Sequence, residues 1–480
     1  MTDSSLSIGL LALAGTLLLS ACNLGPHYVR PDIPAPPTWT PITPESTASQ
    51  PGPPDSNAWP DAQWWQGFGS TELDRLINQA QLANDDLKAA VARVQQSDAQ
   101  VRIAGAALLP SLNAGFTPSR SRQIVPSAPG TTETSNTFTA FLSAGYELDF
   151  WGKNAALRAA AAAQATGSHY DRDTVRLSIL ASVATTYFTA LSLRDRVNVA
   201  TINLANARET LRGLQLEQRV GTANALDVAQ QQSLVDNEDA AVPALRAQLS
   251  HTLAALAILL GVTADKLQLS EGTLEQVAAP PVTTGLPAGL LVRRPDVASA
   301  EAQLVAANAN IRAARAAFLP TIQLTASGGL ESTALSTLLE PGSRIFDLTA
   351  GITQPIFEGG QLAGAYALSK GRYQELLADY HKAVISAFDN TQDSLTQVHE
   401  SAEQLVRQER ATLSARRAYD FSQQQFHAGT INVLTVLATE TTLLTAQDTQ
   451  AQVRLAHLSA LVGLYQALGG GWDIQQEQAP

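Results

Sequence analysis

Residues 137–150 have the sequence TFTAFLSAGYELDF, and this stretch decides the fold. Its even positions are apolar from Phe138 to Phe150, while most odd positions are Thr, Ser, Gly, Glu or Asp. A period of two residues predicts a β-strand with one apolar and one polar face. Such a strand separates lipid from a watery lumen, or it belongs to a sandwich with one solvated face. The alternation by itself does not distinguish the two.

Three further segments alternate in the same way, at 321–330, at 345–356 and, more weakly, at 112–123. The four strands form two pairs, each inserted between long helical segments, with long polar connections at 124–136 and 331–344. This arrangement favours membrane strands. Four strands cannot close a transmembrane barrel, because about eight is the smallest number that does. Closure therefore requires other subunits.

The remaining segments are helical in pattern. Apolar residues from Leu73 to Ala104 have the spacing of one long helix that ends before Pro110. Other helical segments, such as 155–165 and 298–317, are rich in alanine. Small side chains allow helices to pack closely over long distances, as in a coiled coil. Alanine is also the best helix former, so composition does not separate close packing from simple propensity.

The two halves of the chain resemble each other at a nearly constant offset. Residues 102–111 match 312–321 at an offset of 210, and the motif beginning Gly221-Thr-Ala-Asn matches the one beginning Gly429-Thr-Ile-Asn at 208. Leu142-Ser-Ala-Gly also matches Leu348-Thr-Ala-Gly, and Leu260-Gly matches Leu468-Gly. Four matches in the same order predict an internal duplication. The repeat unit has a helix, two strands, a helix, a Gly-Thr turn and a returning helix.

The N-terminus carries the pattern of a lipoprotein signal. An apolar run at 8–19 is followed by Leu19-Ser-Ala-Cys22, and Cys22 is the only cysteine. Cleavage before Cys22 would leave a lipidated N-terminal residue, so 1–21 is the expected signal peptide. A small buried cysteine is the alternative. The first seven residues depart from the signal pattern because they contain no Lys or Arg.

The segment after Cys22 is rich in Pro, Ser and Thr, so 22–62 is expected to be a lipidated, extended tether. Beyond the signal, the longest apolar run is 253–262, shorter than the ~20 residues of a spanning helix. A membrane span would then have to be β-structure. One lipidated terminus is only part of a stable membrane anchor, and a second membrane-binding feature is expected.

Composition excludes several functions. The net charge of -12 and pI near 5.1 argue against nucleic-acid binding, because phosphate recognition needs clustered Lys and Arg. The seven histidines lack zinc-ligand spacing, and no Gly-rich phosphate loop follows a strand. We therefore predict no enzyme activity, no catalytic residue, no metal site and no cofactor apart from the covalent lipid on Cys22.

Several motifs together resemble one family. They are Gly25-Pro-His-Tyr-Val-Arg-Pro31, Trp64-Trp65 with Phe68, Asn84-Asp-Asp-Leu87, and the run from Arg294-Pro-Asp-Val through Ala306-Ala-Asn-Ala-Asn to Phe318-Leu-Pro320. The sequence resembles the outer membrane efflux protein family, the TolC-like channels, and specifically its NodT-type lipoprotein branch. The resemblance covers nearly the whole mature chain.

This resemblance implies an α+β membrane protein that forms a homotrimer. Each protomer would give four strands to a shared 12-stranded outer membrane barrel and its helices to a long periplasmic tunnel. The two repeats would occupy 63–270 and 294–470, with a linker at 271–293 and a tail at 471–480. Asn23, next to the lipidated cysteine, is consistent with delivery to the outer membrane.

The resemblance also implies the function. Such channels are passive exit ducts of tripartite efflux pumps, which dock a periplasmic adaptor and an inner membrane transporter, usually of the resistance-nodulation-division class. A type I protein-secretion duct and a structural envelope lipoprotein without a pore are the alternatives. The cargo could be a drug, an aromatic acid or a metal ion, because selection takes place in the transporter.

Two short turns are the predicted periplasmic tips and the adaptor docking sites. They contain Gly221 with Thr222 and Gly429 with Thr430. Glycine suits such a reversal because it adopts positive φ without strain. Ordinary helix ends with no docking role are the alternative. His427, beside the second turn, is either a pH sensor or an exposed turn residue.

The expected gate lacks the family's usual charges. Acidic residues that often ring the pore in this family are replaced by Thr435 and Ala438, and Phe426 and Ile431 flank the second turn. Asp227, in the first hairpin, is the carboxylate that remains. Our hypothesis is that apolar contact holds this gate and that cation selectivity at the second ring is weak. The acidic residues of the polar strand faces, Glu147 and Asp347, are expected to line the lumen.

Overall fold

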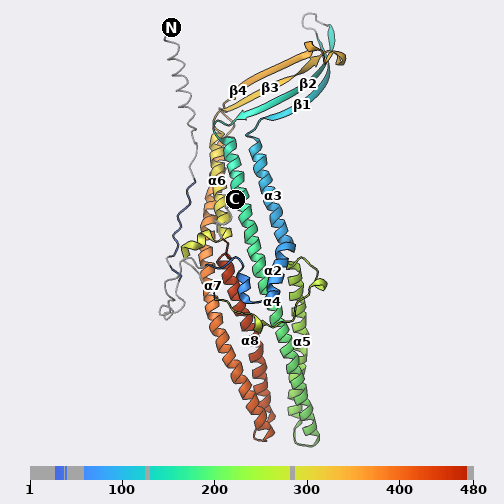
Figure 1. Cartoon of the computed structure of the whole chain (residues 1–480), viewed down its shortest axis with the longest axis vertical. Coiled ribbons are helices and arrows are strands. Elements are labelled where there is room, and N and C mark those ends of the chain that lie inside the picture. Colours follow the sequence, from blue (N-terminus) through green and yellow to red (C-terminus); the bar gives the residue numbers. More distant parts are fainter. Residues whose placement is uncertain (1–27, 37, 40–58, 125–129, 282–286, 473–480) are drawn as a thin grey trace. The chain divides into compact units, whose positions relative to one another are not determined.

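The computed structural model describes residues 28–36, 38–39, 59–124, 130–281 and 287–472 (Figure 1). Cys22, the signal segment and much of the 22–62 tether lie outside the described residues. Long helices and one four-stranded antiparallel sheet make up the described chain. The helices are α2 Thr71–Ala83, α3 Asp85–Ala106, α4 Lys153–Arg219, α5 Ala225–Leu259, α6 Pro295–Ala316, α7 Gln361–His427 and α8 Val433–Ala467. The strands are β1 Ser111–Ile124, β2 Thr132–Leu148, β3 Thr321–Ser332 and β4 Arg344–Thr353.

The duplication predicted from the sequence is confirmed by the elements. Helices α4 and α7 are both 67 residues long and begin at Lys153 and Gln361, an offset of 208. Helices α5 and α8 are both 35 residues long and begin at Ala225 and Val433, again 208 apart. One supersecondary unit is therefore used twice.

The chain forms two compact units, and each draws on both repeats. The first unit contains residues up to 32, Arg93–His169 and Ser299–Tyr380, which include all four strands and the adjoining helix ends. The second unit contains Ile33–Ala92, Tyr170–Ala298 and the chain from His381 onward. The strands and the ends of the long hairpins are thus parts of different units.

The sheet has the order β1-β2-β3-β4, with every pair antiparallel. In its register, apolar residues pair with apolar residues and polar residues with polar ones across the central part of the sheet. Leu112 pairs with Ala144, Ala144 with Ala326, and Ala326 with Leu348. The next line across the sheet is polar and consists of Asn113, Ser143, Ser327 and Asp347. Because side chains alternate between faces along a strand, the four sequence patterns combine into one apolar and one polar face.

Several strand ends differ from the sequence prediction by two or three residues, as where β4 ends at Thr353 and not at 356, and two differences are larger. Strand β2 begins at Thr132 and not near residue 137, because the polar residues 132–136 pair with 120–124 of β1 although they show no alternation. The helix expected from Leu73 to Ala104 is divided at Asn84 into α2 and α3. The Asn84 side chain accepts a hydrogen bond from the Leu87 N–H at 3.0 Å and donates to the Leu259 carbonyl at 2.9 Å. Asn84 therefore caps the new helix and fastens it to the end of α5.

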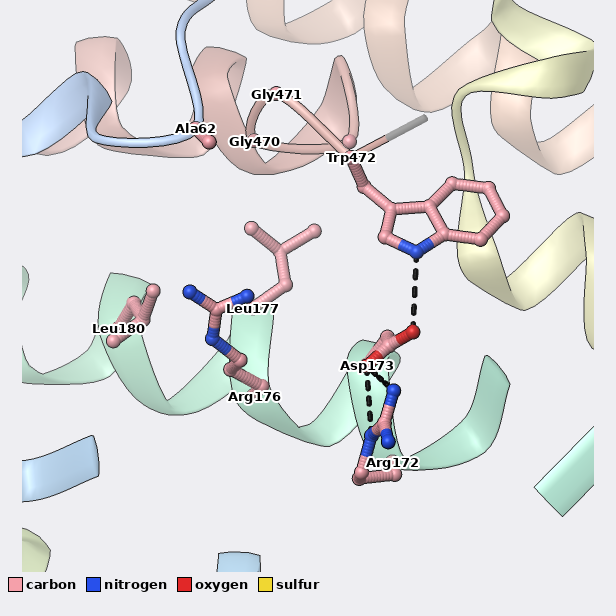
Figure 2. Close-up of a pocket in the computed structure, with 10 residues that line it drawn as sticks. Ala62, Arg172, Asp173, Arg176, Leu177, Leu180, Gly470, Gly471 and Trp472 are labelled. Atoms are coloured by element: carbon pink, nitrogen blue, oxygen red, sulfur yellow. Dashed lines mark hydrogen bonds and ion pairs between the residues drawn. The ribbon is translucent and has the colours of Figure 1, made fainter. Parts of the chain in front are cut away.

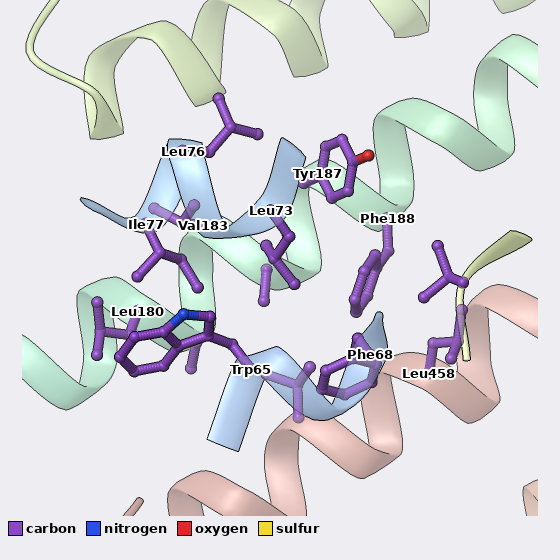
Figure 3. Close-up of a cluster of buried hydrophobic side chains, with 14 of the residues drawn as sticks. Trp65, Phe68, Leu73, Leu76, Ile77, Leu180, Val183, Tyr187, Phe188 and Leu458 are labelled. Carbon is purple, nitrogen blue, oxygen red and sulfur yellow. The ribbon is translucent and has the colours of Figure 1, made fainter. Parts of the chain in front are cut away.

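The second unit is built around an aromatic and aliphatic core (Figure 3). Trp65 and Phe68 pack with residues of α2, α4 and α8, and the Trp64 ring stacks on Tyr465 with centroids 5.0 Å apart. Fully burying one large apolar side chain contributes about 1.5–3 kcal/mol. Burial of Trp64 and Trp65 in this core therefore explains why the motif marks the start of the folded chain.

Helices α4 and α5 each contain an 18-residue stretch long and apolar enough, by length and composition alone, to cross a membrane. The sequence analysis predicted no helical span. Half of the α4 stretch is buried inside the protein. Val183, Phe188 and Leu191 of α4 are core residues of the second unit, so protein packing explains the apolar character of this helix.

Candidate functional site

The apolar face of the sheet is exposed in the single chain. Large side chains on it include Leu112 and Leu348, which are 72% and 75% exposed, and Phe346, which is 84% exposed. A contiguous row of this kind marks a surface that contacts lipid or another protein. The face therefore requires a cover that the single chain does not supply within its described residues.

The opposite face carries hydroxyl, amide and carboxylate groups. Thr139 donates to Glu331 at 3.3 Å, and Glu147 forms an ion pair with Lys153 at 2.6 Å. Ile345 is one apolar exception on this face, and Phe141, on the same line across the sheet, is another. Phe141 lies between Gly115 and Gly329, and a Cβ on Gly115 would approach the Phe141 ring to 2.6 Å. Glycine on both neighbouring strands thus leaves room for the ring on a polar face.

Aromatic side chains gather where helices meet strands in the first unit. Trp151 donates its indole N–H to the Pro320 carbonyl at 2.7 Å and packs edge-on against Phe150. Phe318 packs edge-on against Tyr366, whose hydroxyl accepts hydrogen bonds from Arg315. Tyrosine and tryptophan have an apolar body and a polar tip, so they are enriched at membrane–water boundaries. This set, Phe150, Trp151, Phe318 and Tyr366, is called the junction aromatics below.

Each long hairpin reverses at one of the predicted Gly-Thr turns. Gly221 and Gly429 have φ of 83° and 70°. The following threonine hydroxyls, of Thr222 and Thr430, donate to carbonyls five residues back, at 3.0 and 2.9 Å. Both turns therefore end α4 and α7 with left-handed glycine caps. Asn224 and Asn432 then start the returning helices as N-caps.

The candidate gate residues lie within three turns of helix from these reversals. Asp227 accepts a hydrogen bond from the Asn224 N–H and so completes the capping box of α5, which engages its carboxylate locally. Thr435 is exposed and donates to the Asn432 side chain at 3.1 Å. Phe426, Ile431 and Ala438 occupy the end of α7, the turn and the start of α8. His427 lies next to Phe426 at the end of α7.

The structure reveals a polar link between the two hairpins that the sequence analysis missed. Arg196 of α4 forms a two-point ion pair with Asp448 of α8, at 2.6 and 3.1 Å. The pair lies beside a cavity of about 390 Å³ between α4, α5 and α8, which Glu238 also lines. Arg196 and Asp448 are 252 residues apart in sequence, and no local motif marks either residue.

Glu440 is the second group that the sequence analysis missed. It is 2% exposed on α8, and its Oε2 has no hydrogen-bond partner among the described residues. Burial, and then the charge of Glu238, raises the pKa of Glu440 to about 7. Burial and the charge of Glu440 raise the pKa of Tyr419 on α7 to about 12. Glu440 of α8 thus interacts electrostatically with Glu238 of α5 and Tyr419 of α7.

A cavity of about 280 Å³ lies at the end of α8 (Figure 2). Trp472 donates to Asp173 at 3.1 Å, and Asp173 also accepts hydrogen bonds from Arg172 (Figure 2). A Cβ on Gly471 would lie 2.4 Å from the Ala62 nitrogen, so glycine allows the two ends of the folded unit to meet. Among the described residues, no group of three His, Cys, Asp or Glu is arranged to hold a metal ion. The cavity lies where the backbone at Ala62 meets the residues that follow α8.

A model of the family described as outer membrane efflux protein matches residues 76–262 and 286–470. The chain belongs to this family. The two matched segments each cover one copy of the repeat, so both halves of this efflux protein carry the family pattern.

Two named relatives of this efflux protein come from Pseudomonas. The pyoverdine export outer membrane protein OpmQ of Pseudomonas aeruginosa is 41% identical over 472 residues, which cover 97% of each chain. The toluene efflux pump outer membrane protein TtgF of Pseudomonas putida is 34% identical over 468 residues, which cover 96% of this chain and 97% of the relative.

Solved structures show the same fold. A membrane protein from Pseudomonas aeruginosa superposes with a TM-score of 0.85 at 28% identity, covering 93% of this chain and 100% of that one. CusC gives 0.83 at 26% identity, covering 93% and 100%. The open-state MtrE outer membrane channel of Neisseria gonorrhoeae gives 0.81 at 26% identity, covering 94% and 98%. The efflux protein therefore has the TolC-like channel fold, which confirms the fold predicted from the sequence.

Proposed function

We propose that this efflux protein is the exit duct of a tripartite pump. Three protomers form one channel, and small toxic compounds pass through it from the periplasm to the exterior without chemical change. The strands span the outer membrane, and the helices extend into the periplasm. A lipid on Cys22 adds a second attachment. The energy comes from an inner membrane transporter, in keeping with the resistance-nodulation-division class.

The observation that carries this proposal is the open, two-faced sheet. Strands β1 and β4 are its edges, and each pairs on one side only within the described chain. Unpaired strand edges are not tolerated in lipid, so the sheet must be closed by other strands. Three copies supply twelve strands, an even number sufficient for a barrel. The apolar face then meets lipid, and the polar face lines the lumen.

Docking is proposed at the hairpin turns. Gly221, Thr222, Gly429 and Thr430 lie at the helix reversals, and no other described segment packs against the space where a Cβ on either glycine would stand. Their backbone is therefore accessible to a periplasmic adaptor. Copurification of the efflux protein with its adaptor, before and after substitution of Thr222 and Thr430 by lysine, tests this assignment. Unchanged binding of the adaptor by the variant would show that the turns are not part of the docking interface.

The cargo is proposed only as a class of small exported compounds. OpmQ is named for pyoverdine export and TtgF for toluene efflux, and both align over nearly their full length. A deletion strain complemented with this chain, tested for pyoverdine release and for sensitivity to toluene and antibiotics, distinguishes these cargoes. Secretion of a protein substrate by the same strain would instead support the type I duct.

The barrel assignment is tested by one charge placed on either face of the sheet. Leu348→Arg puts the charge on the apolar face, where it costs about 2–4 kcal/mol near the membrane midplane. Ser327→Arg is the matched control on the polar face, because Ser327 follows Ala326, the residue that pairs with Leu348. We expect Leu348→Arg to reduce recovery of outer membrane trimers, and Ser327→Arg to assemble and shift ion selectivity in planar bilayers. Trimers that never conduct would support the structural lipoprotein instead.

A further inference from the structure

Two cationic side chains meet one tyrosine where α6 ends and α7 begins. Arg315 of α6 donates from Nε and Nη2 to the Tyr366 hydroxyl, at 3.0 and 2.9 Å, and its Cζ lies 5.5 Å from the ring centroid. The Nζ of Lys370, about one turn further along α7, lies 5.8 Å from the same centroid. The aromatic ring attracts both cations and fixes their position. Arg315 and Lys370 are called the junction cations below.

The junction cations are not neutralised within the described chain. Both are exposed, and neither forms an ion pair with a described carboxylate. The glutamates that these helices contribute to the first unit are already paired, Glu301 of α6 with Arg30 and Glu375 of α7 with Arg372. Contacts with a ring and a hydroxyl leave the full positive charge in place. In a chain with a net charge of -12, the junction cations therefore form a local positive surface that attracts anions.

A groove in the same unit identifies the side of the helices that continues the polar face of the sheet. It has a volume of about 440 Å³ and is lined by residues of α4, α6 and α7. Lys153 of α4 lies at the groove and is paired with Glu147, which belongs to the polar face. In the proposed channel the polar face lines the lumen, so the groove is on the lumen side.

The junction cations lie on the other side of these helices. The α6 residues of the groove fall between Ala307 and Ala317, and Arg315 projects roughly 140° round the helix from their mean direction. On α7, Arg372 lines the groove and Lys370 precedes it by two residues, which corresponds to about 200° of rotation. Both junction cations therefore face away from the proposed lumen.

The junction cations also lie at the level where helix passes into strand. Arg315 is the last residue but one of α6, and β3 begins at Thr321. Phe318, between them, packs edge-on against Tyr366 with the ring centroids 6.3 Å apart. In the proposed duct the strands lie in the hydrocarbon of the membrane, so this level is that of the lipid headgroups.

We propose that Arg315 and Lys370, held by Tyr366, bind the headgroup phosphate of an anionic phospholipid of the outer membrane. The inference rests on the proposed duct, because that function places the strands in lipid and the polar face toward the lumen. Arginine and lysine are the usual phosphate-binding side chains. The acyl chains of the same lipid would cover part of the apolar face of the sheet, which the single chain leaves exposed. A membrane lipid thus fits both the charge and the apolar surface, whereas free phosphate fits the charge alone.

The experiment measures lipid binding to purified full-chain trimers by native mass spectrometry, with dioleoyl phosphatidylglycerol and dioleoyl phosphatidylcholine as probes. We expect the wild type to prefer phosphatidylglycerol. Arg315→Gln and Lys370→Gln should each weaken its binding by roughly fivefold and leave phosphatidylcholine unchanged. Arg315→Lys, which keeps the charge, should retain most of the preference. Arg372→Gln is the matched control, because it removes a cation from the same level of α7 on the groove side and should bind both lipids as the wild type does.

Three results would overturn the lipid site. They are equal affinity of the wild type for the two lipids, unchanged phosphatidylglycerol binding in the combined Arg315→Gln and Lys370→Gln variant, and an equal loss in Arg372→Gln. Displacement of phosphatidylglycerol by inorganic phosphate would also overturn it, since the site would then recognise phosphate alone. Thermal unfolding of the variants shows whether a loss of lipid binding reflects a loss of folding.

Ion conduction by the same trimers tests the duct separately. Conducting trimers without a headgroup preference would refute the lipid site and leave the duct intact. Trimers that do not conduct would count against the duct whatever lipid they prefer.

Discussion

At the scale of single residues, the buried Glu440 is the most consequential group on the hairpins. An ionised carboxylate without a partner for one of its oxygens is costly in a low-dielectric interior, so Glu440 keeps its proton up to about pH 7. Glu238 on α5 and Tyr419 on α7 are the titratable groups that interact with it. Arg196, which lines the same cavity as Glu238, is already paired with Asp448.

This environment predicts that stability falls as pH rises toward neutrality. The pKa of Glu440 is about 7 in the folded protein and near 4.5 in the unfolded chain, so the folded state binds more protons between these values. The resulting stabilisation is fully present below pH 4.5 and is lost as pH rises through 7. It amounts to about 3 kcal/mol per protomer. Melting temperatures of Glu440→Gln should vary less between about pH 5 and 8 than those of the wild type.

The exposed Glu409 of α7 provides the control, because Glu409→Gln should keep the wild-type pH profile. An unchanged profile in Glu440→Gln would show that other groups set the pH dependence. None of this was predictable from the sequence. Arg196, Asp448, Glu238 and Glu440 come together only through the packing of three helices, and none occurs in a recognisable local motif.

At the scale of elements, the turn glycines provide a graded prediction. Gly429 has φ of 70°, and a Cβ added there would meet open space, so alanine costs only the left-handed backbone strain, about 1–2 kcal/mol. Gly469 has φ of 85°, and its Cβ would lie 1.8 Å from the Arg293 carbonyl oxygen. Gly469→Ala should therefore lower the melting temperature more than Gly429→Ala. Equal losses of melting temperature in the two variants would show that the backbone at Gly469 moves away from Arg293 at no additional cost.

The elements also show what sequence patterns can predict. Strict alternation located the strands at 137–150, 321–330 and 345–356, because one face of each strand is uniformly apolar. The start of β2 at Thr132 was missed, since residues 132–136 are polar on both faces and are ordered by pairing with β1. The break at Asn84 was missed because the apolar period continues across it. The Asn-Asp-Asp sequence that follows α2 was the available signal, a capping residue before an acidic first turn.

At the scale of the whole channel, the proposed trimer would triple the effect of each change at the proposed gate. Thr435 and Ala438 follow Gly429 by six and nine residues, on the first turns of α8. In a trimer, one carboxylate per protomer would place three negative charges around one opening. Rings of carboxylates select for cations in channels. The wild-type residues supply none at these two positions, and this is the observation on which our hypothesis of weak cation selectivity rests.

Ala438→Asp therefore tests the gate directly, with Ala438→Asn as a neutral control of nearly equal size. Single-channel recordings in a salt gradient should show increased cation selectivity for Ala438→Asp and wild-type selectivity for Ala438→Asn. The increase should shrink at high salt, because the Debye length falls to about 3 Å at 1 M. It should also diminish in acid as the three carboxylates protonate. Identical reversal potentials in all three proteins would place residue 438 away from the conducting path and remove the apolar-gate hypothesis.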